Sequence, residues 1–482
     1  AKPLGITGGV IGSPIGLTAA KKMTDDQWLN AMAKYVSNEA NWQTFTGGAR
    51  ELSGLLRDQT AADPARFAQL TLQLTSEVNV AYTNALLLGF GDAEVNERIG
   101  PLVFEAVRHI GSLRQAGNDR FLGTALQKYL REAPLDLVEL ILDRALHALD
   151  PTDDSPVIIR GDTDGRSAAD MHVNGINTAR GSLAEALGDL LIFDSDGQRT
   201  ALITPYLGLL ASDPVLSVRA CVAHTLSASL RYARTEVLIA FAVLIQADDR
   251  LLATEPVERL MVYIGNVDPE AIDPIIQRML ASENAEVREG GGAIAAFAAL
   301  EWARPELMQQ ALSGDFHVRK GIAKLTAEHF VRTSNNELAT ETLIHLMNDD
   351  VDEVRKETAE VASRLRHHSL RPFDRLLMAL IDSSSYVHAA TQLLITLDQA
   401  PDKVDELVLK ASERFISVFG RAAADIRTGA AGDAFYVSKL VVRGLAQSQD
   451  RGHQAALLDI LDQLLELGIY GISDAIATTE RI

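Results

Sequence analysis

The sequence predicts an all-α fold arranged as an α-solenoid, in which helical hairpins stack on one another. Three observations predict it. Alanine and leucine carry the apolar content while aromatic residues make up only 5% of the chain, valine- and isoleucine-rich strand patterns are missing, and one dipeptide pattern recurs at intervals in the thirties. Small apolar side chains allow helices to pack closely. A chain of 482 residues exceeds one compact core, which favours several domains or one extended array.

The net charge of the chain limits its partners. With 65 acidic and 45 basic residues, the formal charge is −20. Nucleic acid is bound by lysine and arginine side chains that release its counterions, so we expect neither DNA nor RNA as a partner. No apolar stretch approaches the roughly 18–20 residues that span a bilayer, and no leader pattern opens the chain. The sequence therefore predicts a cytoplasmic protein without membrane contact, and the missing initiator methionine predicts a longer parent polypeptide.

The first third of the chain is predicted to be helical without a clear repeat. Residues 1–22 are rich in glycine and are predicted to form a linker. Thr24 and Gln27 have the spacing of a capping box, so the first helix of an N-terminal block over 23–149 is expected to start there. Residues 150–173 gather aspartate, proline and glycine and predict an exposed loop. Within the block, amphipathic stretches predict helices at 48–58, 64–75, 96–111, 119–131 and 134–148.

A regular pattern of helix starts covers residues 174–400. A Val-Arg pair, or a near equivalent, recurs at Ala179-Arg180, Val218-Arg219, Val287-Arg288, Val318-Arg319, Val354-Arg355 and Val387-His388. The intervals between successive members are 39, 69, 31, 36 and 33 residues, and Val257-Glu258 divides the longest one. A period of this length is typical of a helical hairpin that stacks on its neighbours. Residues 401–482 are then expected to form a C-terminal helical cap.

A short polar residue stands six positions before each member of this pattern. Such a residue can cap a helix start or accept a hydrogen bond from the arginine that follows it. We therefore predict a structural ladder that ties each turn to the second helix of its repeat and to the next repeat. Both positions are lost at Leu252 and Glu258, so that repeat is expected to be irregular. The predicted ladder residues are Arg180, Arg219, Arg288, Arg319, Arg355, Asp213, Asp349 and Asp382.

These positions resemble those of HEAT repeats, in which an aspartate in the turn and a Val-Arg pair at the start of the second helix recur. Three further segments, at 46–52, at 174–181 and at 437–447 followed by 464–471, resemble parts of a C-terminal helical-repeat region. That region belongs to the bacterial NLR-like signal-transducing NTPases of antiphage defence. The resemblance implies an NTPase module upstream in the same polypeptide and a sensor role toward a protein partner, such as a phage protein.

No motif in the chain predicts catalysis, a cofactor or a metal site. The glycine-rich stretch 5–16 has no lysine where a phosphate loop requires one. An acidic turn around Gly165 would place Arg160 and Met171 at the positions of calcium ligands, which neither side chain can occupy. No His-Glu dipeptide, as in the iron-binding HEAT enzymes, occurs. The single cysteine, Cys221, excludes an internal disulfide and any cysteine-based zinc site, and we expect a buried, inert thiol.

The sequence thus predicts a non-catalytic, protein-binding repeat region whose partner-binding residues are unknown. The helices that begin near the ladder arginines are the candidate surface. A sensor region of a larger NTPase is one hypothesis, and a free-standing scaffold or adaptor is the alternative. A HEAT-type DNA glycosylase would need a basic, aromatic-lined groove, against which the charge and the low aromatic content argue. A phosphate loop upstream in the full-length gene would separate the first two hypotheses.

Overall fold

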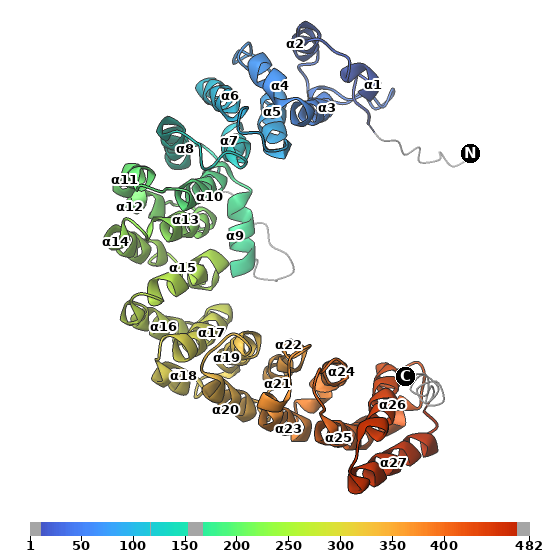
Figure 1. Cartoon of the computed structure of the whole chain (residues 1–482). Coiled ribbons are helices and arrows are strands. Elements are labelled where there is room, and N and C mark those ends of the chain that lie inside the picture. Colours follow the sequence, from blue (N-terminus) through green and yellow to red (C-terminus); the bar gives the residue numbers. More distant parts are fainter. Residues whose placement is uncertain (1–10, 116, 153–166, 470–482) are drawn as a thin grey trace, which may run out of the picture. The chain divides into compact units, whose positions relative to one another are not determined.

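A computed structural model describes residues 11–115, 117–152 and 167–469, and these residues fold almost entirely into helices and turns (Figure 1). The chain forms two compact units, Ala1–Tyr263 and Ile264–Ile482. Over the described ranges, β pairing is limited to isolated bridges of Thr46 with Gly12 and with Asn41. The predicted all-α fold is confirmed. Within the same ranges, no helix has the length and apolar character needed to cross a membrane.

In the first unit, consecutive helices pair as hairpins. Their bounds are α1 (Leu17–Ala20), α2 (Asp25–Lys34), α3 (Ala49–Ala62), α4 (Pro64–Thr71), α5 (Val80–Asp92), α6 (Gly100–Ser112), α7 (Asp119–Leu126), α8 (Leu135–His147), α9 (Ala168–Ile176), α10 (Ala179–Ile192), α11 (Gln198–Ile203), α12 (Leu207–Ala211), α13 (Leu216–Ser229), α14 (Arg234–Ile245) and α15 (Glu255–Gly265). Short 3₁₀ helices lie at η1 (Thr204–Tyr206) and η2 (Asp249–Ala253). The division between the units falls within α15.

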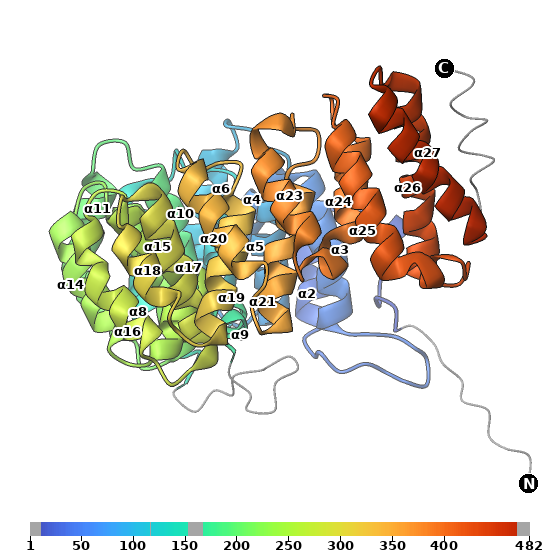
Figure 2. The ribbon, with the colours of Figure 1, turned by 90° about the horizontal axis from the view of Figure 1, so that it is seen from below.

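The second unit continues with the same kind of hairpin. Its helices are α16 (Asp273–Leu280), α17 (Ala285–Glu301), α18 (Pro305–Ala311), α19 (Phe316–His329), α20 (Asn336–Leu346), α21 (Asp352–Ala359), α22 (Val361–Arg364), α23 (Asp374–Asp382), α24 (Tyr386–Asp398), α25 (Asp405–Ala423), α26 (Gly429–Gln447) and α27 (Arg451–Glu466). Two 3₁₀ helices complete it, η3 (Pro269–Ala271) and η4 (Arg371–Phe373). Figure 2 shows α20, α23 and α25 side by side.

Each unit has two rows of helices, and a hairpin contributes one helix to each row. In the first unit α3, α5, α7, α10 and α13 pack successively in what we call the first row, whereas α4, α6, α8, α12 and α14 form the second row (Figure 1). In the second unit α17, α19, α21, α24 and α26 form the first row. The Val-Arg pairs and their equivalents lie at the starts of α10, α13, α15, α17, α19, α21 and α24, as predicted. The helices α3–α8 stack in the same manner although their sequence carries no visible repeat.

The local helix signals near the N-terminus are partly confirmed. Thr24 and Gln27 form the predicted capping box at the start of α2. The helix α5 was not among the predicted stretches, because it is buried around most of its surface and so lacks the polar face that marks an amphipathic helix. Residues 1–10 of the predicted linker lie outside the described residues. The rest of that segment is not a linker, since Gly12 hydrogen-bonds with the backbone of Phe45 and of Gly47.

The predicted loop over 150–173 is too long at its C-terminal end. Residues 153–166 lie outside the described residues, but α9 begins at Ala168. Ser167 caps this helix, because its side chain accepts a hydrogen bond from the backbone N–H of Asp170. The Ser-x-x-Asp spacing is itself a helix-start signal that the surrounding glycine and aspartate residues obscured. The last residues of the predicted C-terminal cap, 470–482, also lie outside the described part of the chain.

The close packing of α17 and α19 depends on Gly321. A Cβ atom at this position would lie 1.9 Å from the backbone oxygen of Glu289, and backbone atoms cannot move aside as a flexible side chain can. Gly321→Ala is therefore expected to lower the free energy of unfolding by about 1–3 kcal/mol, measured by urea denaturation.

The matched control for this substitution is Gly432→Ala in α26, where an added Cβ would meet nothing within 4 Å. Because glycine in a helix costs conformational entropy, this variant is expected to gain roughly 0.5–1 kcal/mol. Equal effects of the two substitutions would contradict the proposed contact at Gly321.

Candidate functional site

Three of the ladder arginines, Arg180, Arg288 and Arg319, connect neighbouring hairpins through their guanidinium groups. Arg180, near the start of α10, donates from Nε to Asp213 Oδ2 at 2.8 Å and from Nη2 to Oδ1 at 3.2 Å. Its Nη1 donates to the backbone oxygen of Ala148 at 3.0 Å. Arg180 is only 8% exposed, so water does not replace these bonds. One side chain thus joins α8, α10 and the turn before α13.

The same arrangement recurs twice in the second unit. Arg288 Nε donates to Asp315 at 2.8 Å, and Arg319 donates to both carboxylate oxygens of Asp349, at 2.6 and 3.1 Å. Each guanidinium also donates a hydrogen bond to a backbone oxygen in its own turn. Arg288 donates to that of Ser282 and Arg319 to that of Gly314. Each arginine therefore links the turn of its own repeat with the turn of the next one.

Arg219 and Arg355 bind mainly within their own repeats. Arg219 donates to the backbone oxygen of Asp213 at 2.5 Å, and Arg355 donates to that of Asp349 at 2.7 Å. Arg355 also bonds to the carboxylate of Asp352. Burial lowers the pKa of the Arg219 guanidinium, although the negative charge of Asp213 opposes the shift.

The predicted partner of each turn aspartate needs correction. The carboxylates of Asp213 and Asp349 accept from the arginine of the preceding repeat, and only their backbone carbonyls accept from the arginine six residues later. The reason is local, since each carboxylate also accepts from the backbone N–H two residues on, at 2.9 Å. This turn conformation holds the carboxylate within hydrogen-bond distance of the arginine of the preceding repeat.

The last predicted ladder pair is not formed. Asp382 is exposed at the end of α23, and His388 contacts Asp352 Oδ1 at 2.9 Å instead. The structural role of the ladder remains a prediction.

Two buried charged residues, Arg199 and Asp194, were missed by the sequence reasoning. Arg199 in α11 donates four hydrogen bonds to backbone oxygens: Leu130 at 2.8 Å, Leu190 at 2.7 Å, Arg131 at 2.9 Å and Ala133 at 2.7 Å. Burial lowers the pKa of its guanidinium. Asp194 accepts from the backbone and hydroxyl of Thr200. Neither residue stands at a repeating position, so the pattern that revealed the ladder could not reveal them.

A cavity of about 320 Å³ lies on the first row of the first unit, where α5, α7, α9 and α10 meet. Leu88, Phe121 and Ile176 provide apolar walls, while the carboxylates of Glu185 and Asp189 lie along α10. Ile176 is 39% exposed although it is apolar. The cavity therefore combines exposed apolar surface with two carboxylates and one guanidinium, that of Arg120, which hydrogen-bonds with Asn177. This lining suits a ligand that is apolar in one part and cationic in another.

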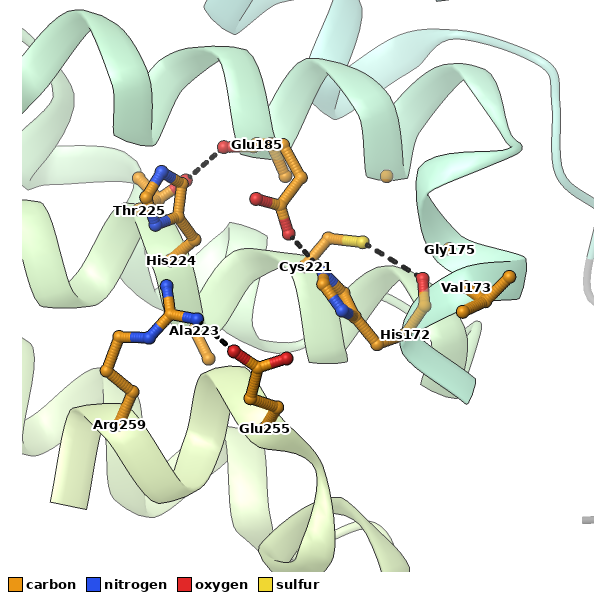
Figure 3. Close-up of polar contacts among 12 residues, drawn as sticks. His172, Val173, Gly175, Glu185, Cys221, Ala223, His224, Thr225, Glu255 and Arg259 are labelled. Atoms are coloured by element: carbon orange, nitrogen blue, oxygen red, sulfur yellow. Dashed lines mark hydrogen bonds and ion pairs between the residues drawn. The ribbon is translucent and has the colours of Figure 1, made fainter. Parts of the chain in front are cut away.

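A cluster of polar side chains adjoins the cavity. His172 Nε2 lies 2.8 Å from Glu185 Oε1, and Cys221 Sγ lies 4.0 Å from the backbone oxygen of His172 (Figure 3). The three side chains come from α9, α10 and α13, and their ligand atoms all lie within 4.8 Å of one another. Cys221 is buried as predicted. Burial, together with the neighbouring Glu185 carboxylate, raises the pKa of its thiol well above the usual value.

His224 extends this cluster along α13. Its Nε2 lies 3.0 Å from Asp189 Oδ1. Burial alone would lower the pKa of His224, but the hydrogen bond to Asp189 and the negative charge of Glu185 outweigh it, so the pKa is raised. Near His224 in Figure 3, Arg259 and Glu255 of α15 form an ion pair with each other. Glu185 thus faces two imidazoles and a thiol.

Comparison with known proteins yields structural neighbours only. No known protein family matches the sequence, and no curated protein matches it either. A crystal structure of an engineered protein is similar over 92% of this chain and 99% of its own, with 14% identity and a TM-score of 0.31.

Two further neighbours come from protein complexes. A chain from the structure of Kap95p with RanGDP, related to nuclear import, is similar over 95% of this chain and 63% of its own, with 10% identity and a TM-score of 0.40. A chain from the Pds5–Scc1 complex, related to cohesin, is similar over 99% of this chain and 83% of its own, with 14% identity and a TM-score of 0.27.

Proposed function

We propose that this chain is a protein-binding helical-repeat scaffold and that it binds its partner on the first row of the first unit. The observation that carries the proposal is the cavity between α5, α7, α9 and α10, because exposed Ile176 lies there beside the carboxylates of Glu185 and Asp189. The partner we propose is a protein segment that places an apolar side chain next to a lysine or arginine. The net charge of −20 favours such a segment over a nucleic acid.

Affinity is expected to come from few residues. Stable protein interfaces bury at least ~1,000 Å², yet a small central group of side chains carries most of the binding energy. Within the cavity, the apolar contact of Ile176 and the charge of Asp189 are the expected contributors. The remaining exposed surface of the first row would extend the interface without adding comparable energy.

The test is selection of binding peptides from a random displayed library against the full chain. We expect the selected peptides to share an apolar residue next to a basic one. Their affinity should fall at least about tenfold in Ile176→Asp and in Asp189→Asn, measured by calorimetry in the presence of a metal chelator. The matched control is Ile239→Asp in α14, a second-row residue that is 64% exposed. If Ile239→Asp weakened peptide binding as much as the two cavity substitutions do, the binding surface would lie outside the cavity.

A salt series with duplex and single-stranded DNA tests the opposing possibility. We expect no specific binding. Submicromolar affinity at physiological salt, falling steeply as salt rises, would contradict the proposed protein partner and favour a nucleic-acid enzyme or binding protein.

The finer hypothesis rests on the sequence resemblance alone. We propose that the chain is the sensor region of a cytoplasmic bacterial NTPase of antiphage defence, that a phage protein is its partner, and that the chain itself is not an enzyme. A free-standing scaffold or adaptor is the alternative. A phosphate-loop motif upstream in the full-length gene would support the first hypothesis, and its absence would leave the second.

A further inference from the structure

We propose that His172, Glu185 and Cys221 form a binding site for one Zn²⁺ ion. The site joins three helices, since His172 lies on α9, Glu185 on α10 and Cys221 on α13. The ligand atoms are His172 Nε2, a carboxylate oxygen of Glu185 and Cys221 Sγ, all within 4.8 Å of one another. No sequence motif indicates the site, because helix packing alone brings the three residues together.

The geometry suits zinc after small adjustments. Zinc bonds of about 2.0–2.3 Å in a tetrahedral arrangement place neighbouring ligand atoms roughly 3.3–3.7 Å apart. The nitrogen and the carboxylate oxygen now lie 2.8 Å apart, as a hydrogen-bonded pair does, so they would separate by less than ~1 Å. The sulfur lies within 4.8 Å of the other two ligand atoms, so it would move inward by no more than about 1.5 Å. Shifts of this size are within the range of side-chain rotation.

The donor set favours zinc over harder cations. A thiolate and an imidazole select zinc and related transition metals, whereas magnesium and calcium prefer oxygen ligands alone. Three protein ligands leave a fourth position, which water occupies in zinc sites of this type. His172 and Glu185 are each 24% exposed at their side chains, so solvent reaches that position. The Cys221 side of the site is fully buried.

The electrostatic surroundings also favour a cation. The Glu185 carboxylate is the negative group that both His172 and Cys221 face. The nearest positive group on α15, Arg259, is already paired with Glu255. His224 hydrogen-bonds with Asp189 and is not among the three residues whose ligand atoms lie within 4.8 Å of one another. Binding of Zn²⁺ would displace the thiol proton to solvent and convert the thiol into a thiolate ligand.

The backbone at Gly175 holds the site together. A Cβ atom at Gly175 would lie 2.1 Å from the backbone oxygen of Ser217 and 2.6 Å from Cys221 Sγ. The end of α9 therefore approaches α13 closely enough for His172 to reach the other two ligands. Because Ile176 on the same helix lines the cavity, the ion would also fix one wall of that cavity.

The experiment is titration of the purified, chelator-treated full chain with Zn²⁺, and with Co²⁺ as a spectroscopic probe. We expect one equivalent to bind with a dissociation constant in the micromolar range or below. Cobalt should produce thiolate-to-metal absorption in the near ultraviolet. Cys221→Ser should abolish that absorption, and Glu185→Gln should weaken zinc binding at least about tenfold. Zinc should also raise the unfolding temperature of the native chain.

The matched control is His329→Gln in α19, which removes an imidazole that pairs with Glu301 at 2.9 Å, as His172 pairs with Glu185, but is not a proposed ligand; it should leave the zinc affinity unchanged. Circular dichroism without metal checks that each variant is folded. If Cys221→Ser fails to fold, Glu185→Gln still decides the outcome, because the Glu185 side chain is 24% exposed and the amide is close in size and shape to the carboxylate. No zinc binding at about ten micromolar metal, or equal affinities for the native chain and Glu185→Gln, would overturn the site. The peptide assays contain chelator, so they succeed or fail independently of this result.

Discussion

Arg199→Ala is expected to lower the free energy of unfolding by about 3–5 kcal/mol. The guanidinium donates hydrogen bonds to four backbone oxygens, and the residue is only 8% exposed. Alanine leaves two of those acceptors, the backbone oxygens of Leu190 and Ala133, buried without this donor, and it removes a side chain that connects the ends of two hairpins. The free energy is measured by urea denaturation of the full chain, followed by circular dichroism.

The control for Arg199 is Arg57→Ala in α3. Arg57 pairs with Asp92 at 2.5 Å, but both side chains are more than 40% exposed. Exposed ion pairs of this kind contribute about 0–1 kcal/mol, so this variant should unfold almost as the native chain does. A loss at Arg199 no greater than the loss at Arg57 would mean that water reaches the four carbonyl oxygens.

Arg180→Ala is expected to lower the free energy of unfolding by about 3–4 kcal/mol. Its ion pair with Asp213 is buried at both ends, with side-chain exposures of 10% and 9%. Removing the guanidinium leaves the carboxylate buried and without its charged partner. A double-mutant cycle with Asp213→Asn should yield a coupling energy of about 1.5–3 kcal/mol.

Arg219→Ala provides the comparison within the ladder. Arg219 donates to the neutral carbonyls of Asp213 and Ser212 and leaves no unpaired carboxylate when it is removed. We expect a loss of about 1–2 kcal/mol. If Arg219→Ala were as destabilising as Arg180→Ala, the interaction between repeats would not be the main contribution of the ladder. An unchanged unfolding energy for Arg180→Ala would contradict the structural role altogether.

The sequence predicted helix positions most accurately over 174–400, where the Val-Arg pattern repeats. The Val-Arg pairs located the starts of the first-row helices because a solenoid places each repeat in the same surroundings, so the same residues recur. Helix α5 was not predicted, because neighbouring helices cover most of its surface and its sequence therefore has no polar face. The loss of the ladder positions at Leu252 and Glu258 predicted an irregular repeat, and the division between the two units falls in α15, which contains Glu258.

The candidate sites depend on contacts that no sequence pattern encodes. The sequence excluded any cysteine-based zinc site because it offers one cysteine, yet a single thiol can share a metal with an imidazole and a carboxylate. His172 and Glu185 are 13 residues apart, and Cys221 follows 36 residues after Glu185. Only the packing of α9, α10 and α13 reveals that the three side chains meet. Arg199 could not be predicted for a similar reason. Its partners are backbone oxygens, which every residue has, so no residue type in the sequence indicates them.

The arginine–aspartate bonds between repeats bridge unequal lengths of chain. The paired residues are 33 positions apart for Arg180 and Asp213, 27 for Arg288 and Asp315, and 30 for Arg319 and Asp349. The distance from the arginine Nε to the carboxylate oxygen stays at 2.6–2.8 Å in all three pairs, so the extra residues are accommodated by the second-row helices and their connections. Over evolution, such a chain can gain or lose residues along that edge while the opposite edge keeps its register. New binding loops can therefore arise there without a change in how the hairpins stack.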